Sequence, residues 1–71
     1  MTYTEIYKAA YNFHWQSQKI LAQRGANSEA WEVIANGMIA ISNQYKNEYL
    51  DELLRLVYTE IARTHNQIQE D

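Results

Sequence analysis

The sequence predicts an all-α protein, a compact three-helix bundle with short loops. Three observations lead to this prediction. Apolar residues recur at helical spacing in three segments, proline is absent, and 46% of the 71 residues are hydrophobic. Apolar side chains three and four positions apart share one face of an α-helix, which is buried against neighbouring helices. This length corresponds to one domain, so we expect residues 1–71 to fold as a single unit.

The first helix is predicted over residues 3–24. Thr2 and Glu5 have the spacing of a capping box, in which each side chain accepts a hydrogen bond from the other residue's backbone N–H. A stripe with the spacing of a core-facing surface follows, formed by Tyr3, Ile6, Tyr7, Ala10, Phe13, His14, Ser17, Ile20 and Leu21. Gly25 ends the helix, because glycine readily adopts the left-handed conformation common after a helix C-terminus.

The second helix is predicted over residues 28–44, with Asn27 or Ser28 as its N-cap. Its apolar seam alternates spacings of three and four and consists of Trp31, Ile34, Met38, Ile41 and Tyr45. Further apolar residues widen this seam on both sides and leave only a narrow polar strip. We therefore expect this helix to be the most buried of the three.

The third helix is predicted over residues 48–69 from the phase of the apolar pattern. Continuing the previous seam would place Glu48, Glu52 and Arg55 in the core. The apolar stripe instead restarts in a new phase, at Leu50, Leu53, Leu54, Val57, Ile61 and Ile68. A shift of this kind indicates a break between two helices rather than one continuous helix.

We expect the chain to turn within residues 43–47, with Asn47 capping the third helix and acidic residues in its first turn. The sequence leaves one alternative open. The second and third helices would then form one long helix, and a second, swapped chain would complete the bundle.

Composition and charge exclude several classes of protein. The net charge of −3 has the wrong sign for a general nucleic-acid binder and is too small for a DNA mimic. The absence of cysteine excludes disulfides and thiolate metal sites. No apolar run approaches the roughly 18 residues needed to span a membrane, and the N-terminal residues lack the pattern of a signal peptide. We expect a complete, small acidic protein of the cytoplasm.

A basic and aromatic flank of the first helix is the candidate binding surface. Lys8, Tyr11, Trp15 and Lys19 fall together on a helical wheel, beside the core stripe rather than within it. Tyrosine and tryptophan are the residue types that dominate protein interfaces. Small domains without disulfides or metals also gain stability from self-association. The flank therefore predicts binding to another protein, to a second copy in a homodimer, or to both, unless another part of the chain covers Trp15.

The remaining candidates for chemistry have simpler explanations. His14 and His65 approach each other if the first and third helices pack together, but no third metal ligand has suitable spacing. We interpret His14 as a hydrogen-bonded residue of the core or its boundary. Glu48, Asp51 and Glu52 complement the positive end of a helix dipole. We therefore predict no catalytic residues, no metal and no cofactor.

DNA binding is the alternative function. In a helix-turn-helix arrangement the third helix would present Arg55, Thr59, Arg63 and Asn66 to DNA. The acidic residues at the start of the same helix would meet phosphates unfavourably, and the other basic residues are scattered. The sequence favours a small non-enzymatic interaction module instead, that is, an adaptor, an assembly subunit or a protein inhibitor of the kind that phages and bacteria produce.

Overall fold

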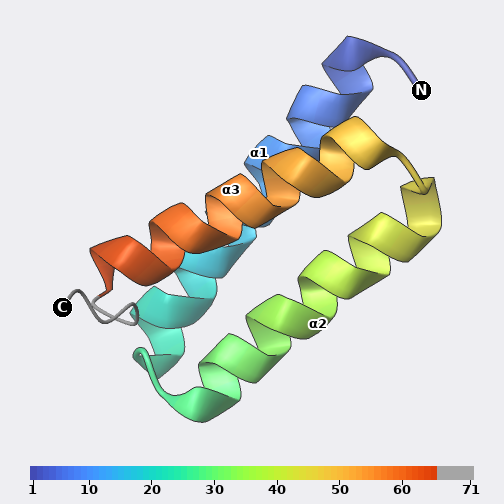
Figure 1. Ribbon diagram of the computed structural model, residues 1–71. Helices are drawn as coiled ribbons and strands as arrows, with labels where there is room; N and C mark the ends of the chain where they lie inside the picture. The colour runs from blue at the N-terminus through green and yellow to red at the C-terminus, as the bar shows by residue number, and fades with distance from the viewer. Residues whose placement is uncertain (66–71) are drawn as a thin grey trace, which may run out of the picture.

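The computed structural model describes residues 1–65, which form three α-helices joined by short loops. These helices are α1 (Tyr3–Arg24), α2 (Ser28–Tyr45) and α3 (Glu48–Thr64). Figure 1 shows that α1 and α3 run side by side in the same direction, whereas α2 runs in the opposite direction. The predicted compact three-helix bundle is confirmed. Within residues 1–65, no helix combines the length and apolar character that crossing a bilayer requires.

The helices begin and end close to the residues that their local chemistry predicts. Helix α2 extends one residue beyond the predicted 28–44, and α3 ends at Thr64. The last part of the predicted third helix, residues 66–69, lies outside the described residues. Because α2 and α3 are separated at Lys46 and Asn47, the structure does not contain the single long helix that the sequence left open.

Side-chain caps explain where each helix starts. The Thr2 hydroxyl accepts a hydrogen bond from the backbone N–H of Glu5 at 3.2 Å, and the Glu5 carboxylate accepts one from the backbone N–H of Thr2 at 2.7 Å. The hydrogen bond from the Thr2 backbone N–H is the largest cause of a lowered pKa for the Glu5 carboxyl, and the Thr2 side chain lowers the same pKa further. Asn27 and Asn47 cap α2 and α3 in the same way, since their side-chain oxygens accept from backbone N–H groups three residues later.

The turn between α2 and α3 depends on one residue in an unfavourable backbone conformation. Lys46 has φ 50° and ψ 52°, the left-handed helical region, and its backbone N–H donates to the carbonyl of Ser42 at 2.9 Å. For residues with a Cβ atom this conformation costs roughly 1–2 kcal/mol. The equivalent position after α1 is occupied by Gly25, with φ 80°.

The core lies mainly between α1 and α3, which pack against each other more extensively than either packs against α2. Its buried apolar side chains are Ile6, Ala10, Phe13, Leu21, Ala30, Ile34, Leu50, Leu54 and Ile61. Trp31, Met38, Ile41 and Tyr58 are among the partly buried residues at its edge. This arrangement leaves α2 covering one side of a pair of parallel helices.

Three sequence predictions about the core are wrong. Helix α2 is the least buried helix, with only Ala30 and Ile34 fully buried, against five residues in α1 and four in α3. The apolar residues of α2 are spread around more of its circumference than two neighbouring helices can cover. The core stripe predicted for the first helix includes Tyr3 and Tyr7, but they are 70% and 52% exposed. The seam predicted for the second helix includes Tyr45, which is 42% exposed.

Replacing Lys46 with glycine should raise the free energy of unfolding by up to about 1 kcal/mol, because glycine adopts the left-handed conformation without a steric penalty. Chemical denaturation monitored by circular dichroism measures this change. Lys46→Ala is the matched control, since it removes the side chain but keeps the Cβ atom, and it should leave the stability nearly unchanged. Equal stabilisation by both substitutions would contradict the backbone explanation.

Candidate protein-interaction surface

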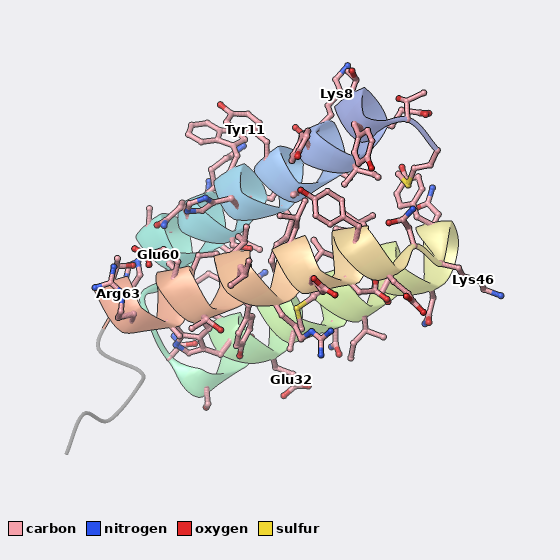
Figure 2. The ribbon with its side chains drawn as sticks, turned by 45° about the horizontal axis from the view of Figure 1, so that its top comes forward. Lys8, Tyr11, Glu32, Lys46, Glu60 and Arg63 are labelled. Carbon is pink, nitrogen blue, oxygen red and sulfur yellow. The ribbon has the colours of Figure 1, made fainter. Side chains whose placement is uncertain are left out.

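The predicted surface on the first helix is open to solvent. Tyr11 is 68% exposed and Trp15 is 55% exposed, and Lys8 and Lys19 are exposed beside them. Figure 2 shows Lys8 and Tyr11 projecting from α1 on the side away from α2. The structure therefore places all four residues together, and no other part of the described chain covers Trp15.

Three tyrosines outside the predicted surface extend it toward α3. The Tyr7 and Tyr49 hydroxyls form a hydrogen bond of 2.8 Å between α1 and α3. The ring of Tyr49 also stands edge-on to both Tyr3 and Tyr7, with ring centroids 5.8 and 6.1 Å apart. These edge-to-face contacts are a preferred geometry for aromatic rings. They hold three exposed rings in fixed positions at one end of the molecule.

The spacing of the aromatic residues explains why this surface continues along α1. Tyr3, Tyr7, Tyr11 and Trp15 follow one another at intervals of four residues. Four residues span 400° of an α-helix, so each step moves about 40° around the helix axis. The series thus winds from the side facing α3 to the outer side of α1. This regular spacing was a signal in the sequence that Tyr3 and Tyr7 belong with Tyr11 rather than with the core.

Helix α3 contributes two residues to the same surface. Tyr49 is in contact with α1, and Leu56, two helical turns further along α3, is exposed. We define the aromatic face as Tyr3, Tyr7, Tyr11, Trp15, Tyr49 and Leu56. Large apolar side chains that are exposed together in this way mark sites of interaction on soluble proteins.

The hydrogen bond within the aromatic face changes the ionisation of one phenol. The hydrogen bond with Tyr7 is the largest cause of a raised pKa for Tyr49, followed by partial desolvation and by the nearby Tyr7, Tyr3 and Glu52. The raised pKa keeps the phenol of Tyr49 neutral at physiological pH.

Charged side chains stand at the margins of the aromatic face. Lys8 and Lys19 lie on the α1 side, and Glu48 and Glu52 lie on the α3 side, all exposed. Within the described residues, the ion pairs are Arg24 with Glu29 at 3.8 Å and Arg63 with Glu60 at 2.6 Å. Neither pair includes the lysines or the glutamates of these margins, so those charges are available to a partner.

The two histidines are linked through Gln18. The Gln18 amide nitrogen lies 3.3 Å from Nε2 of His14, and its amide oxygen lies 3.3 Å from Nε2 of His65. With this orientation of the amide, the nitrogen donates to His14 and the oxygen accepts from His65. Gln18 is partly buried and connects α1 to the end of α3. In the part of the chain described, no cluster of three or more potential ligands could hold a metal ion.

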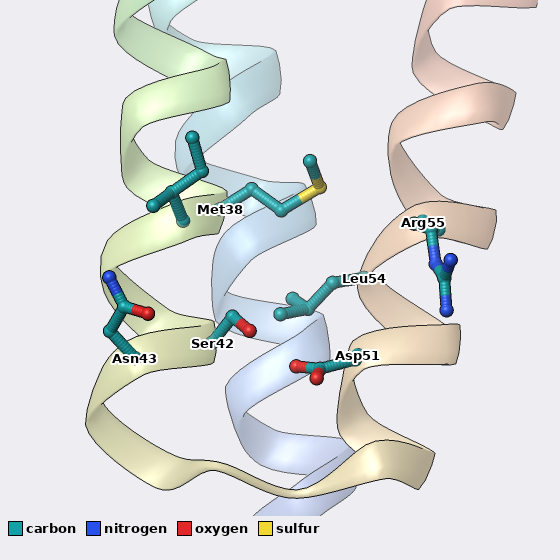
Figure 3. Close-up of a pocket in the computed structure, with 7 residues that line it drawn as sticks. Met38, Ser42, Asn43, Asp51, Leu54 and Arg55 are labelled. Atoms are coloured by element: carbon teal, nitrogen blue, oxygen red, sulfur yellow. The ribbon is translucent and has the colours of Figure 1, made fainter.

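Two open grooves flank α2 because this helix packs loosely. The groove between α1 and α2 has a volume of about 270 Å³ and a largely apolar lining that includes Phe13, Ile20 and Val33. The groove between α2 and α3 has a volume of about 300 Å³. Figure 3 shows Asp51 of α3 and Ser42 of α2 extending toward each other across this second groove. One carboxylate oxygen of Asp51 is buried without a hydrogen-bond partner from the described residues.

The candidate DNA-binding residues are only partly available. Arg55, Thr59 and Arg63 are exposed and follow one another at intervals of four along α3. However, the Arg63 guanidinium donates two hydrogen bonds to the Glu60 carboxylate, at 3.1 and 2.6 Å. Arg55 lines the groove between α2 and α3. Asn66, the fourth predicted residue, lies outside the described residues.

Comparisons with known proteins found no matching family model, no matching curated protein and no matching solved structure. The fold and the aromatic face therefore define the class of this protein, a small three-helix bundle with an exposed aromatic surface on two of its helices.

Replacing Tyr7 with phenylalanine should lower the pKa of Tyr49 toward the ordinary value near 10, because the hydrogen bond between the two hydroxyls is the largest cause of the elevation. A raised pKa in the folded state means that this hydrogen bond stabilises the fold fully below the ordinary pKa. The contribution of this hydrogen bond to the free energy of unfolding is lost as the pH rises through the raised pKa of Tyr49.

Titration of the tyrosine ring carbons by NMR measures this shift. Tyr45→Phe is the matched control, since Tyr45 is an exposed tyrosine of α2 outside the aromatic face. A Tyr49 pKa that is the same in the wild type and in Tyr7→Phe would argue against the hydrogen bond.

Proposed function

We propose that this protein is a small non-enzymatic interaction module that binds a partner protein through the aromatic face. The observation that carries the proposal is the exposure of six large apolar side chains on α1 and α3. Aromatic side chains contribute large contact areas and have few rotatable bonds to immobilise, which makes them effective anchors at interfaces. An adaptor, an assembly subunit or an inhibitor that occupies a partner's surface would all use such a face.

The arrangement of the tyrosines adds to this proposal. The contacts among Tyr3, Tyr7 and Tyr49 fix their rings before any partner binds. A preformed surface reduces the conformational entropy lost on binding. The phenol oxygens also supply donors and acceptors at the edge of an otherwise apolar contact. We place the interaction in the cytoplasm as part of the proposal, because a chain without cysteine gains no disulfides in an oxidising compartment.

DNA binding through α3 remains the second candidate because Arg55, Thr59 and Arg63 share one line along the helix. The ion pair of Arg63 with Glu60 and the net charge of −3 both weaken attraction to phosphates. Titration of a fluorescent DNA duplex at low salt tests this candidate. Binding that falls in Arg55→Ala and weakens steeply with added salt would favour it over the aromatic face.

Trp15→Ala and Tyr11→Ala should each change the free energy of unfolding by less than about 1 kcal/mol, because both side chains are exposed. Each should weaken partner binding by about 2 kcal/mol, which corresponds to roughly 30-fold in Kd, if these residues are anchors. Thermal denaturation measures stability, and affinity capture with the wild type and the variants as bait measures partner retention.

Ile39→Ala is the matched control for the capture experiment, because Ile39 is an exposed apolar residue of α2 that lies outside the aromatic face. A partner retained by the wild type and by Ile39→Ala, but lost with both aromatic variants, is the expected result. Unfolding of either aromatic variant would show that these side chains are structural, and equal retention by all baits would overturn the proposed surface.

A further inference from the structure

Lys8 and Glu52, which lie at opposite margins of the aromatic face, carry opposite charges, and the exposed Arg55 lies beyond Glu52 along α3. Lys8 lies between the buried residues Ile6 and Ala10, two positions from each, so it projects away from the core. Glu52 lies in the same way between the buried Leu50 and Leu54 of α3. A path across the surface from α1 to α3 therefore crosses a lysine, the contacting rings of the aromatic face, and then a glutamate.

Lys8 and Glu52 also lie at nearly the same height along the helices. The hydrogen bond between Tyr7 and Tyr49 fixes the relative height of α1 and α3, and the two helices run in the same direction (Figure 1). Lys8 is one residue beyond Tyr7, and Glu52 is three residues beyond Tyr49. At 1.5 Å per residue, the two charged residues differ in height by about 3 Å.

Two copies of this surface can place their opposite charges against each other if a two-fold axis of one particular orientation relates them. A two-fold axis that lies in the surface and runs parallel to the helices exchanges the two margins without changing height. Lys8 of one copy then meets Glu52 of the other, and the same pair forms a second time. An axis perpendicular to the helices would instead bring the lysine margins of both copies together. The charges therefore favour the parallel arrangement.

The whole outer surface of α1 and α3, which carries the aromatic face along about 18 Å of its length, is large enough for a specific contact between two copies. Helix α1 has 22 residues and α3 has 17, so the surface over the two helices is about 30 Å long. Two adjacent helices present a width of about 20 Å. Each copy would thus bury about 600 Å², giving a total near the lower bound of about 1,200 Å² for specific interfaces.

We propose that the partner of the aromatic face is a second copy of this chain, in a parallel two-fold dimer that pairs Lys8 of each copy with Glu52 of the other. This inference rests on the proposed function and names its partner. The tyrosines and Trp15 supply the buried apolar contact. The two marginal ion pairs select the orientation, because charges at the rim of an interface contribute more to specificity than to affinity.

Charge reversal tests the pairing. Sedimentation equilibrium at low salt should show that Lys8→Glu and Glu52→Lys each raise the dimer dissociation constant about tenfold or more, since each substitution places like charges together at two symmetric positions. The double variant carrying both substitutions should restore the wild-type value to within about threefold. Lys46→Glu, which makes the same charge change at the α2–α3 turn, should have no such effect.

Cysteine pairs test the orientation, because the chain contains no cysteine of its own. Mixing Lys8→Cys with Glu52→Cys under mild oxidation should produce a disulfide-linked dimer of the two variants. Preferential linkage of Lys8→Cys to Lys19→Cys would instead indicate the antiparallel arrangement and overturn the proposal. Circular dichroism of each variant verifies that it is folded.

Two outcomes separate this inference from the proposed function. A wild-type chain that stays monomeric from micromolar to millimolar concentration would overturn the dimer, and the capture experiment with Trp15→Ala and Ile39→Ala would still test a foreign partner. A dimer that is unaffected by Trp15→Ala, by Tyr11→Ala and by charge reversal at Lys8 would also overturn the inference, because self-association would then use another surface. Equal retention of a captured partner by the wild type, Trp15→Ala and Ile39→Ala would overturn the proposed function itself.

Discussion

The packing of α1 against α3 is the interaction on which the rest of the structure depends. Side chains from both helices form most of the core, and this contact fixes the two helices in a parallel arrangement. The same contact brings Tyr7 beside Tyr49 at one end and Gln18 beside His65 at the other. The outer surface of the pair then carries the exposed aromatic residues, so the element that stabilises the fold also presents the proposed binding surface.

Helix α2 has a different part in the structure. It is held near its start, where Ala30 and Ile34 are buried and Trp31 stands edge-on to Tyr58 at 5.8 Å. Toward its end it leaves grooves on both sides, and its contact with α3 is the smallest in the bundle. Within the described residues, buried polar atoms without a hydrogen-bond partner occur at both ends of α2, at Nε1 of Trp31 and at one carboxylate oxygen of Asp51, which lies across the groove from the end of α2. Loose packing of α2 accounts for the two grooves.

Local features of the sequence predicted the helices well, because caps act over three or four residues. Thr2 with Glu5, Asn27 and Asn47 each form the expected hydrogen bonds. The burial of α2 and the position of Tyr7 depend on which helices become neighbours, and periodicity alone does not contain this information. Tyrosine is also ambiguous, since its ring suits a core and its hydroxyl suits a surface. The exposure of Tyr11 and Trp15 could be predicted from the pattern of the first helix alone. That Tyr49 belongs to the aromatic face could not, because this depends on the packing of α3 against α1.

The parallel contact between α1 and α3 has a consequence for how the chain folds. Helical bundles commonly fold fast because most of their contacts are local in sequence. Here the largest helix contact joins segments at opposite ends of the chain, as the separation of 42 residues between Tyr7 and Tyr49 illustrates. Neither pair of consecutive helices, α1 with α2 or α2 with α3, contains this contact. An N-terminal segment that ends after α2 therefore lacks most of the surface against which α1 is buried. Emergence of α3 from the ribosome is therefore the step that permits the native core to form.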